Sequence, residues 1–216
     1  MKKLFPIVAL LTQGAASQLQ ATGDVTGPGN SIIGGQMIGG VFVPATEGTP
    51  AGNANMYPAD GKPSFTIDNN LSTKYRNFGE LNTGFVVTVS LTLVTRLDLG
   101  TANNAPERDP LTFTLEGTTG DPLTGIYTLI ASGSTGFEND PWRQTGVISS
   151  TFPAVGAFTS YRLIFPTVRN SATADSMQIG EVALSGVAAP EPSILSLLGI
   201  SALGLSGARR KRLAAV

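Results

Sequence analysis

Short segments in which apolar and polar residues alternate, separated by turn residues, most constrain what this chain can fold into. Phe113 and Leu115 alternate with polar neighbours, and Tyr161, Leu163 and Phe165 recur at the same spacing. Side chains two residues apart lie on the same face of a β-strand, so each segment has one apolar face. No long amphipathic helix is evident before residue 190. The pattern therefore predicts a chain of half-buried strands.

The turn residues between these segments indicate where each strand ends. Val, Ile, Thr and Phe are enriched inside the segments, whereas Gly, Pro, Asn and Asp fill the connections. The predicted strands span residues 83–89, 93–99, 111–117, 127–132, 145–152, 160–166 and 178–186. Residues 18–40 are rich in Gly, Thr, Ser and Gln and are predicted to form a flexible leader. The fold class that follows is all-β, an antiparallel β-sandwich or jelly roll.

The C-terminal segment combines a short motif, an uncharged run and a basic stop. The run covers residues 193–208 and is rich in Leu, Ile, Ala and Gly. As a helix it would be roughly 24 Å long, slightly short of the ~30 Å hydrocarbon core of a bilayer. Basic side chains after such a run stay on the cytoplasmic side, so the rest of the chain would lie outside. The motif and the stop consist of Pro190, Glu191, Pro192, Arg209, Arg210, Lys211 and Arg212.

This segment resembles the PEP-CTERM sorting signal of Gram-negative bacteria. The resemblance implies export, transient anchoring in the inner membrane by a transmembrane helix, and cleavage near the Pro-Glu-Pro motif by an exosortase. The mature protein would then reach the cell surface or the extracellular matrix. The class is associated with exopolysaccharide production, which makes a glycan the expected partner. An ordinary anchor that is never cut is the alternative, and it also places the domain outside the cytoplasm.

The N-terminus also has the features of an export signal. Lys2 and Lys3 precede an apolar run at residues 4–11, and small residues follow up to Ser17. We therefore predict a signal peptide at residues 1–17, cleaved after Ala16 or Ser17. The predicted domains are completed by a leader and first strand region at 18–49, a β-sandwich at 50–187, and the sorting segment at 188–216.

Composition narrows the function classes. Removing residues 1–17 and 190–216 from the 216 residues leaves 172, a normal size for one domain. Six of the 14 basic residues and one of the 15 acidic residues lie in the removed segments, so the remainder has 8 basic and 14 acidic residues and a net charge of −6. That balance argues against a nucleic-acid partner. The absence of Cys excludes disulfides, and the absence of His removes the commonest general base and zinc ligand.

A polar loop between predicted strands is the best candidate for a metal site. Asp68, Asn69, Asn70 and Thr73 lie within six residues of each other, in a sequence that does not suit regular structure. Carboxylate, hydroxyl and carbonyl oxygens from such a loop are the ligands that Ca²⁺ prefers. The spacing differs from that of an EF-hand. The alternative is an Asx-turn in which Asp68 only closes its own loop.

The same loop resembles that of discoidin, or coagulation factor 5/8 type C, domains, which are galactose-binding-like jelly rolls. These domains have an Asp, a turn residue, a Thr five residues after the Asp and an aromatic residue seven after it. Asp68, Asn69, Thr73 and Tyr75 occupy those places, with Asn in place of the usual Gly and Tyr where Trp is more usual. The segments 110–117, 161–165 and 177–186 resemble later strands of the family. The resemblance covers roughly residues 50–187.

The resemblance also implies a calcium site and its ligands. In the family, a Glu in the last strand segment returns to the Asp loop, and Glu181 is the matching residue here. The implied ligand set is Asp68, Asn70, Thr73 and Glu181, around a structural Ca²⁺ ion. The alternative leaves Glu181 simply exposed to solvent.

Three further residues are candidates for ligand contact. Tyr75 and Trp142 are aromatic side chains that could stack on the apolar face of a sugar ring, although both could equally be core or hinge residues. Arg108 lies in a polar loop and could hold a carboxylate or a sugar hydroxyl. Its alternative role is an internal salt bridge with Glu107 or Asp109, or a bond to a neighbouring carbonyl.

The sequence therefore predicts a non-enzymatic, exported protein that binds carbohydrate through loops of a calcium-stiffened β-sandwich. No catalytic residue is predicted. One alternative is a structural matrix protein without a specific ligand, which the low charge and high Gly, Thr and Ser content also fit. The other is a glycan-active enzyme with a carboxylate pair drawn from Asp98, Glu107, Glu116 and Asp121.

Overall fold

The computed structural model describes residues 23–50, 52–139 and 147–189, and in these ranges the regular structure is strand and short 3-10 helix. The prediction of an all-β antiparallel fold is confirmed; only the short β4–β5 pair is parallel. The elements are β1 (Gly23–Asp24), β2 (Ser31–Ile38), β3 (Val41–Pro44), β4 (Thr46–Glu47), β5 (Met56–Tyr57), η1 (Pro63–Thr66), β6 (Tyr75–Asn77), β7 (Thr83–Gly100), η2 (Pro106–Arg108), β8 (Thr112–Thr118), β9 (Thr128–Ser134), η3 (Phe137–Asn139), β10 (Val147–Thr151), β11 (Ala157–Phe165), β12 (Met177–Ile179) and β13 (Glu181–Ala188).

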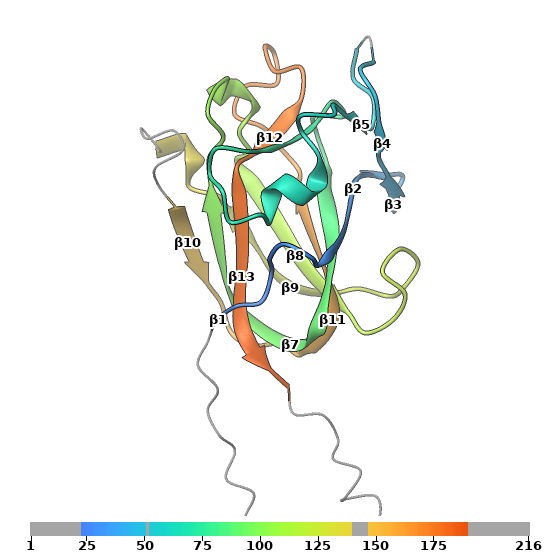
Figure 1. Cartoon of the computed structure of the whole chain (residues 1–216), viewed down its shortest axis with the longest axis vertical. Coiled ribbons are helices and arrows are strands. Elements are labelled where there is room, and N and C mark those ends of the chain that lie inside the picture. The colour runs from blue at the N-terminus through green and yellow to red at the C-terminus, as the bar shows by residue number, and fades with distance from the viewer. Residues whose placement is uncertain (1–22, 51, 140–146, 190–216) are drawn as a thin grey trace, which may run out of the picture.

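One long strand, β7, belongs to both layers of the sandwich (Figure 1). Its first part, residues 83–88, lies between β2 and β11, and its second part, residues 92–100, lies between β13 and β10. The chain bends between the two parts at residues 89–91. One layer therefore has the order β3-β2-β7-β11-β8-β9 and the other the order β1-β13-β7-β10. The sequence predicted two separate strands here, at 83–89 and 93–99.

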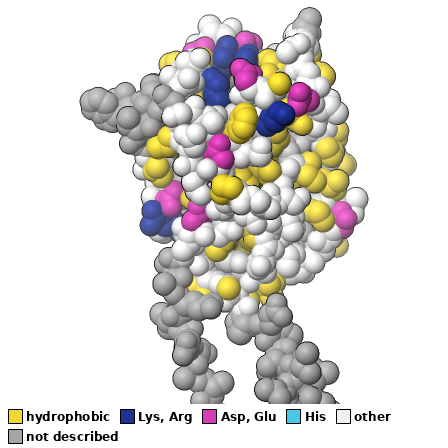
Figure 2. All heavy atoms as spheres, in the orientation of Figure 1, with side chains coloured by type: hydrophobic (Ala, Val, Ile, Leu, Met, Phe, Trp, Pro, Cys, Tyr) yellow, Lys and Arg dark blue, Asp and Glu magenta, His cyan; other side chains and the backbone are white. Residues whose placement is uncertain are grey.

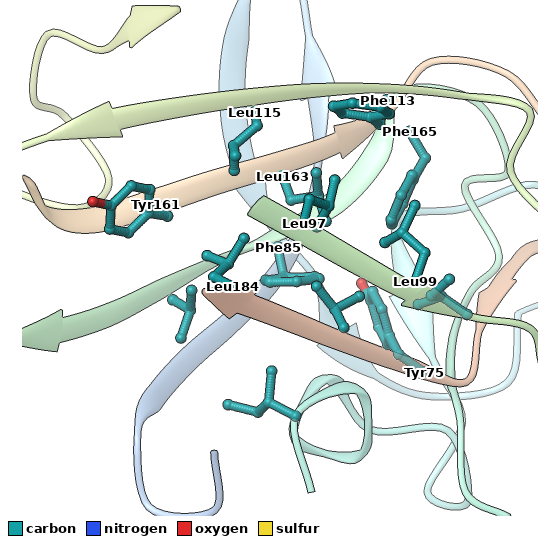
Figure 3. Close-up of a cluster of buried hydrophobic side chains, with 14 of the residues drawn as sticks. Tyr75, Phe85, Leu97, Leu99, Phe113, Leu115, Tyr161, Leu163, Phe165 and Leu184 are labelled. Carbon is teal, nitrogen blue, oxygen red and sulfur yellow. The ribbon is translucent and has the colours of Figure 1, made fainter. Parts of the chain in front are cut away.

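The hydrophobic core lies between these layers (Figure 3). Phe113 and Leu115 of β8 and Leu163 of β11 are buried in it, as their alternation predicted. Along β7 the alternation changes phase where the register with β13 shifts at Ser185 and Gly186, so Val94 and Leu97 are both buried. The bulge thus allows β7 to keep apolar side chains in the core both before and after the irregular pairing.

The prediction of a flexible leader across residues 18–40 is wrong for its second half. Ser31–Ile38 forms β2, which pairs with β7 and continues through the Gly39-Gly40 turn into β3. Both turn glycines have positive φ, which suits a two-residue hairpin turn. Gly34 is needed because an added Cβ would lie 2.5 Å from the Tyr75 hydroxyl. The glycines that suggested flexibility therefore serve a tight turn and close packing.

The sandwich has two different ends, and the chain enters and leaves at the same one. Gly23 pairs with Gly186, so both ends of the described domain lie together, at the bottom of Figure 1. We call this the lower end. The opposite end, the loop end, contains β6, β12 and the loops at 68–74, 101–110 and 166–176. Among the described residues no helix is long and apolar enough to cross a membrane. The predicted signal peptide and transmembrane helix lie outside these residues.

Candidate functional site

The Asp68 loop is held at both of its ends by the core. Ile67 before it and Tyr75 after it are buried, so residues 68–74 must turn outward between two fixed points. Asn69 has a left-handed backbone with φ of 61°, which Asn adopts more readily than most residues. The turn expected at this position is therefore present. The loop lies at the loop end of the sandwich.

Within the loop, Asp68 and Thr73 form the hydrogen bonds that define its shape. The Thr73 hydroxyl lies 2.8 Å from Asp68 Oδ2 and 2.8 Å from the carbonyl oxygen of Asn70. The Asn70 backbone N–H donates to Asp68 Oδ1 at 3.0 Å, which is the Asx-turn considered above. The Asn70 side chain accepts from the Ser72 N–H at 3.0 Å. The predicted loop residues thus converge, and the side chain of Asn70 closes the turn.

Glu181, at the start of β13, reaches this loop from 111 residues away. Its Oε2 accepts from the Asn70 N–H at 3.2 Å, so one donor lies between the carboxylates of Glu181 and Asp68. Its Oε1 is buried without a hydrogen-bond partner among the described residues. The exposed position considered as the alternative for Glu181 is therefore excluded.

This environment makes the Glu181 carboxylate costly to ionise. Burial raises its pKa to about 7, and the negative charges of Asp68 and Asp24 add to the rise. Hydrogen bonds from the N–H groups of Asn70 and Asn69 oppose the rise without cancelling it. Glu181 is thus half-buried, lies beside the carboxylate of Asp68 and has one oxygen without a partner. Among the described residues it forms no salt bridge that would offset its charge.

The oxygen atoms at this point match the chemistry of a hard cation. Two carboxylates, the Thr73 hydroxyl and the Asn70 carbonyl lie together, and Ca²⁺ takes 6–8 such ligands. No group of three or more His, Cys, Asp or Glu side chains suited to a metal occurs in residues 23–50, 52–139 and 147–189. A cation here would therefore depend on hydroxyl, carbonyl and water oxygens besides Asp68 and Glu181.

A second polar cluster adjoins the loop and joins it to β12. The Lys74 ammonium donates to the side-chain oxygens of Asn103 at 3.0 Å and Gln178 at 3.3 Å, and it also contacts Asn104. Gln178 is buried and donates to the carbonyl oxygen of Ala105 at 2.9 Å. Because these residues come from three separate segments, the cluster fixes the loop at 101–105 against β6 and β12.

A third group, centred on Asp175, arranges two guanidinium groups side by side. Arg108 Nε lies 2.7 Å from Asp175 Oδ1, and Arg76 Nη2 lies 3.0 Å from Asp175 Oδ2. The Arg76 guanidinium also covers the Phe78 ring, 4.5 Å from its centre. Burial raises the pKa of Asp175, but the hydrogen bond from Ser176 and the two arginines outweigh it and lower the pKa below its usual value. Charged side chains accordingly gather at the loop end in Figure 2.

The structure contradicts one of the three ligand predictions. Tyr75 has no exposed surface, accepts from Asn77 Nδ2 at 2.9 Å and donates to the Gly84 carbonyl at 3.3 Å. The prediction of sugar stacking by Tyr75 is therefore wrong, and its alternative role in the core is what the structure shows. Arg108 lies at the loop end and forms an internal salt bridge with Asp175. Trp142 lies outside the described residues.

Several site residues were missed by sequence reasoning. Lys74 and Arg76 flank the inward-facing Tyr75, so strand alternation alone could have placed both on the outer face. Asp175 and Gln178 had no such signal, because their partners lie about a hundred residues away. Loop contacts of this kind depend on how distant segments meet.

Two of the four carboxylates considered for catalysis are ion-paired. Glu116 of β8 pairs with Arg162 at 2.7 Å, and Asp98 of β7 pairs with Arg96 at 2.8 Å. β8 belongs to one layer of the sandwich, and residues 92–100 of β7 belong to the other. These two acids therefore do not form a pair across one site.

The fold and this site define a class: an antiparallel β-sandwich domain with ion-paired, amide-rich loops at the end opposite Gly23 and Gly186. Beyond the sandwich, residues 188–212 match the model of the PEP-CTERM protein-sorting motif, which confirms the sorting signal predicted from the sequence. No curated protein matches the chain.

Solved structures similar to this chain are family 32 carbohydrate-binding modules and related domains. The module of Clostridium perfringens NanJ in complex with galactose is 13% identical, covering 60% of this chain and 88% of the other, with a TM-score of 0.46. A C. perfringens family 32 module in complex with GalNAc-β-1,3-galactose is 12% identical, covering 72% and 94%, with a TM-score of 0.49. A variant of chitosan-binding module 1 from the Paenibacillus sp. IK-5 chitosanase/glucanase is 15% identical, covering 77% and 100%, with a TM-score of 0.49. Such identities leave the ligand of this chain unassigned.

Proposed function

We propose that this protein is an exported, non-enzymatic carbohydrate-binding protein whose loop end contacts a polysaccharide. The observation that carries the proposal is the arrangement of Arg76 and Arg108 on Asp175, beside the Lys74 cluster and the Asp68 loop. These side chains come from distant segments and are oriented by one another. Fixed charged and amide groups are suited to vicinal sugar hydroxyls, which both donate and accept hydrogen bonds.

An aromatic side chain lies next to these polar groups. The Phe78 ring is half-buried, and the Arg76 guanidinium covers it. Apolar and polar surfaces side by side suit a pyranose, which has an apolar face and a rim of hydroxyls. Phe78 thus takes the place in the proposal that the sequence had given to Tyr75.

The position of the sorting motif supports an arrangement in which the loop end faces outward. The motif begins at residue 188, at the lower end of the sandwich, and implies an exported protein processed by an exosortase. A chain attached there, first to the inner membrane and later to the cell surface or matrix, presents its loop end outward. An exopolysaccharide of the same surface is therefore the partner that we propose.

Calcium would act on the loop and not on the sugar directly. Asp68, Asn70, Thr73 and Glu181 would hold it, with Asn70 contributing its backbone carbonyl. The ion would supply the positive charge that the two carboxylates lack. Its bound state would tie the Asp68 loop to β13 and so stiffen one side of the loop end.

Retention on polysaccharide tests the proposal. The domain, residues 18–189, is passed over immobilised exopolysaccharide in Ca²⁺, together with Arg108→Gln and a matched control, Arg96→Gln. Arg96 is also ion-paired to an aspartate but lies on β7 of the other layer. We expect Arg108→Gln to weaken retention about 10-fold or more, as loss of a charged hydrogen-bond donor does, and Arg96→Gln to leave it unchanged. No retention of the wild-type domain, or equal losses in both variants, would contradict the proposal.

A structural matrix role is the second candidate, because one observation favours it. Ile38, Val41 and Val43 on the β2–β3 hairpin are large apolar side chains that are at least one third exposed. β3 is also an edge strand, paired only with β2 among the described strands. Concentration-dependent association in light scattering that disappears in Val41→Lys, together with no glycan retention, would favour this role over sugar binding.

A further inference from the structure

Asp24 of β1 pairs with Ser185 near the lower end of the sandwich. The three further segments that form this end carry no charged side chain. These are the β7 bend at residues 89–93, the loop at 152–156 and the end of β13 at 186–189. They lie together, because Ala188 pairs with Thr92, Ala157 pairs with Leu93, and the Ala189 N–H donates to the Leu91 carbonyl at 2.9 Å. The surface they form is therefore uncharged and continuous.

This surface contrasts with the rest of the molecule. Val155 is 50% exposed on it, whereas Figure 2 shows several charged side chains at the loop end and a smaller charged group lower on one side. The nearest charges along β7 are Arg96 and Asp98, which are paired with each other at 2.8 Å. The loop between β8 and β9, which carries Asp121, projects from the side of the sandwich in Figure 1.

Only a short stretch of chain separates this surface from the uncharged run at residues 193–208. Ala189 is hydrogen-bonded to the β7 bend, and the run begins at Ser193. Four residue steps reach at most roughly 14 Å. The headgroup layer of one leaflet is itself roughly 5–8 Å thick. With residue 193 at the edge of the hydrocarbon, the lower end is held within a few ångströms of the headgroups.

We propose that the lower end is a membrane-facing surface, which lies against the lipid headgroups while the sorting tail is uncut. The inference rests on the membrane anchoring in the proposed function and adds the surface that makes the contact. Charged groups on this surface would have to give up hydration close to the bilayer, and the three segments contain none. The second part of β7, residues 92–100, then holds the loop end roughly 27 Å further out.

Two matched cysteine variants test this contact, because the chain has no native cysteine. Ser90→Cys places a label on the lower end, and Ser171→Cys places one at the loop end; both serines are exposed. Each full-length chain is labelled with an environment-sensitive fluorophore and reconstituted into phosphatidylethanolamine–phosphatidylglycerol vesicles. Nitroxide-labelled headgroups then serve as the quencher, and sedimentation with the vesicles reports anchoring independently.

We expect the label at residue 90 to shift its emission to the blue and to be quenched several-fold more than the label at residue 171. Equal responses at the two positions in chains that sediment with the vesicles would overturn the membrane-facing surface and leave anchoring intact. Failure to sediment would overturn the anchoring on which it rests. A blue shift at residue 90 without vesicles, rising with protein concentration, would assign the surface to a second copy and also overturn the proposal.

Discussion

Replacing Glu181 by Gln has opposite expected effects on stability with and without calcium. Without a cation, the substitution removes a half-buried carboxylate whose Oε1 has no partner among the described residues and which lies beside Asp68. The neutral amide keeps a similar shape and still accepts from the Asn70 N–H. With calcium, the same substitution removes a charged ligand. We therefore expect Glu181→Gln to stabilise the domain in EDTA and to reduce its response to Ca²⁺.

The size of the first effect follows from the pKa of Glu181. A rise from 4.5 to about 7 corresponds to roughly 3 kcal/mol before any discount, at about 1.36 kcal/mol for each tenfold change. Because the side chain is only half-buried, solvent screens much of this, and we expect roughly 1 kcal/mol. For a domain of this size that raises the melting midpoint by roughly 2–4 °C.

The same reasoning fixes the pH dependence of the wild-type domain in EDTA. The folded state holds a proton on Glu181 that the unfolded state releases near pH 4.5, so the folded state binds more protons between pH 4.5 and about 7. The contribution of Glu181 to stability is therefore fully present below pH 4.5 and is lost as the pH rises to about 7. The difference between wild type and Glu181→Gln should vanish at pH 4.5 and be complete at pH 8.

Urea unfolding of residues 18–189 measures both effects, at pH 4.5 and pH 8, in EDTA and in Ca²⁺. Calcium at a hundred times its Kd would add about 2.7 kcal/mol to the wild type. Glu138→Gln is the matched control, because Glu138 is exposed and its carboxylate accepts from Ser134. A lower stability of Glu181→Gln than wild type at pH 8 in EDTA would refute the argument from the unpartnered carboxylate. Equal calcium responses in both would remove Glu181 from the proposed ligand set.

Three further substitutions test the packing and the loop end. Tyr75→Phe removes the buried hydrogen bonds that the Tyr75 hydroxyl makes with Asn77 and the Gly84 carbonyl, and it should lower the free energy of unfolding by about 1–2 kcal/mol in urea titrations, whereas sugar retention should not change. Gly34→Ala places a Cβ 2.5 Å from the Tyr75 hydroxyl and should cost about 1–3 kcal/mol by the same assay; an unchanged midpoint would contradict this packing. Asp175→Asn removes the charge that orients the two arginines and should change stability by less than about 1 kcal/mol while weakening polysaccharide retention, and a large loss of stability would show a structural role instead.

The strand pattern was predictable because one face of each strand is buried and the other is not. Phe113 and Leu115 on β8, and Leu163 on β11, were assigned to the core side from alternation alone, and they are buried. The same rule could not show that residues 83–100 form one strand. Continuity across the bend at residues 89–91 depends on pairing with β11 and β13, which local sequence does not contain. The segment 178–186, predicted as one strand, forms two strands, β12 and β13, that are separated at Gly180. This division also depends on pairing, because β12 pairs with β6 and β13 with β7.

β2 was missed because a glycine in a sequence can indicate either a flexible segment or a position of close packing. Gly34 and Gly35 lower the local preference for strand, and a flexible leader was the natural interpretation. In the fold, Gly34 lies against Tyr75 and Pro63, where a larger residue would clash. Whether a glycine marks flexibility or close approach is decided by what packs against it. That information is held by residues 29 and 41 positions away, Pro63 and Tyr75.

The candidate site was predictable where a motif carried it and unpredictable where only tertiary contacts did. The approach of Glu181 to the Asp68 loop followed from the family resemblance, and the hydrogen bond through Asn70 shows that the two meet. Tyr75 was misassigned because an aromatic residue beside a polar loop can face either way. Strand alternation placed it inward, and the same alternation turned Lys74 and Arg76 toward the loop end.

The long strand β7 relates the two ends of the molecule physically. Gly100, at its end, pairs with Glu181 beside the Asp68 loop, and Thr92, near its bend, pairs with Ala188 at the start of the sorting motif. The same pair of strands, β7 and β13, thus runs from the proposed cation site to the proposed membrane-facing surface. Because the two strands are paired along this length with a single bulge, the direction in which the chain leaves the lower end fixes the direction in which the loop end points. A domain attached through β13 therefore presents its charged loops away from the surface that carries it.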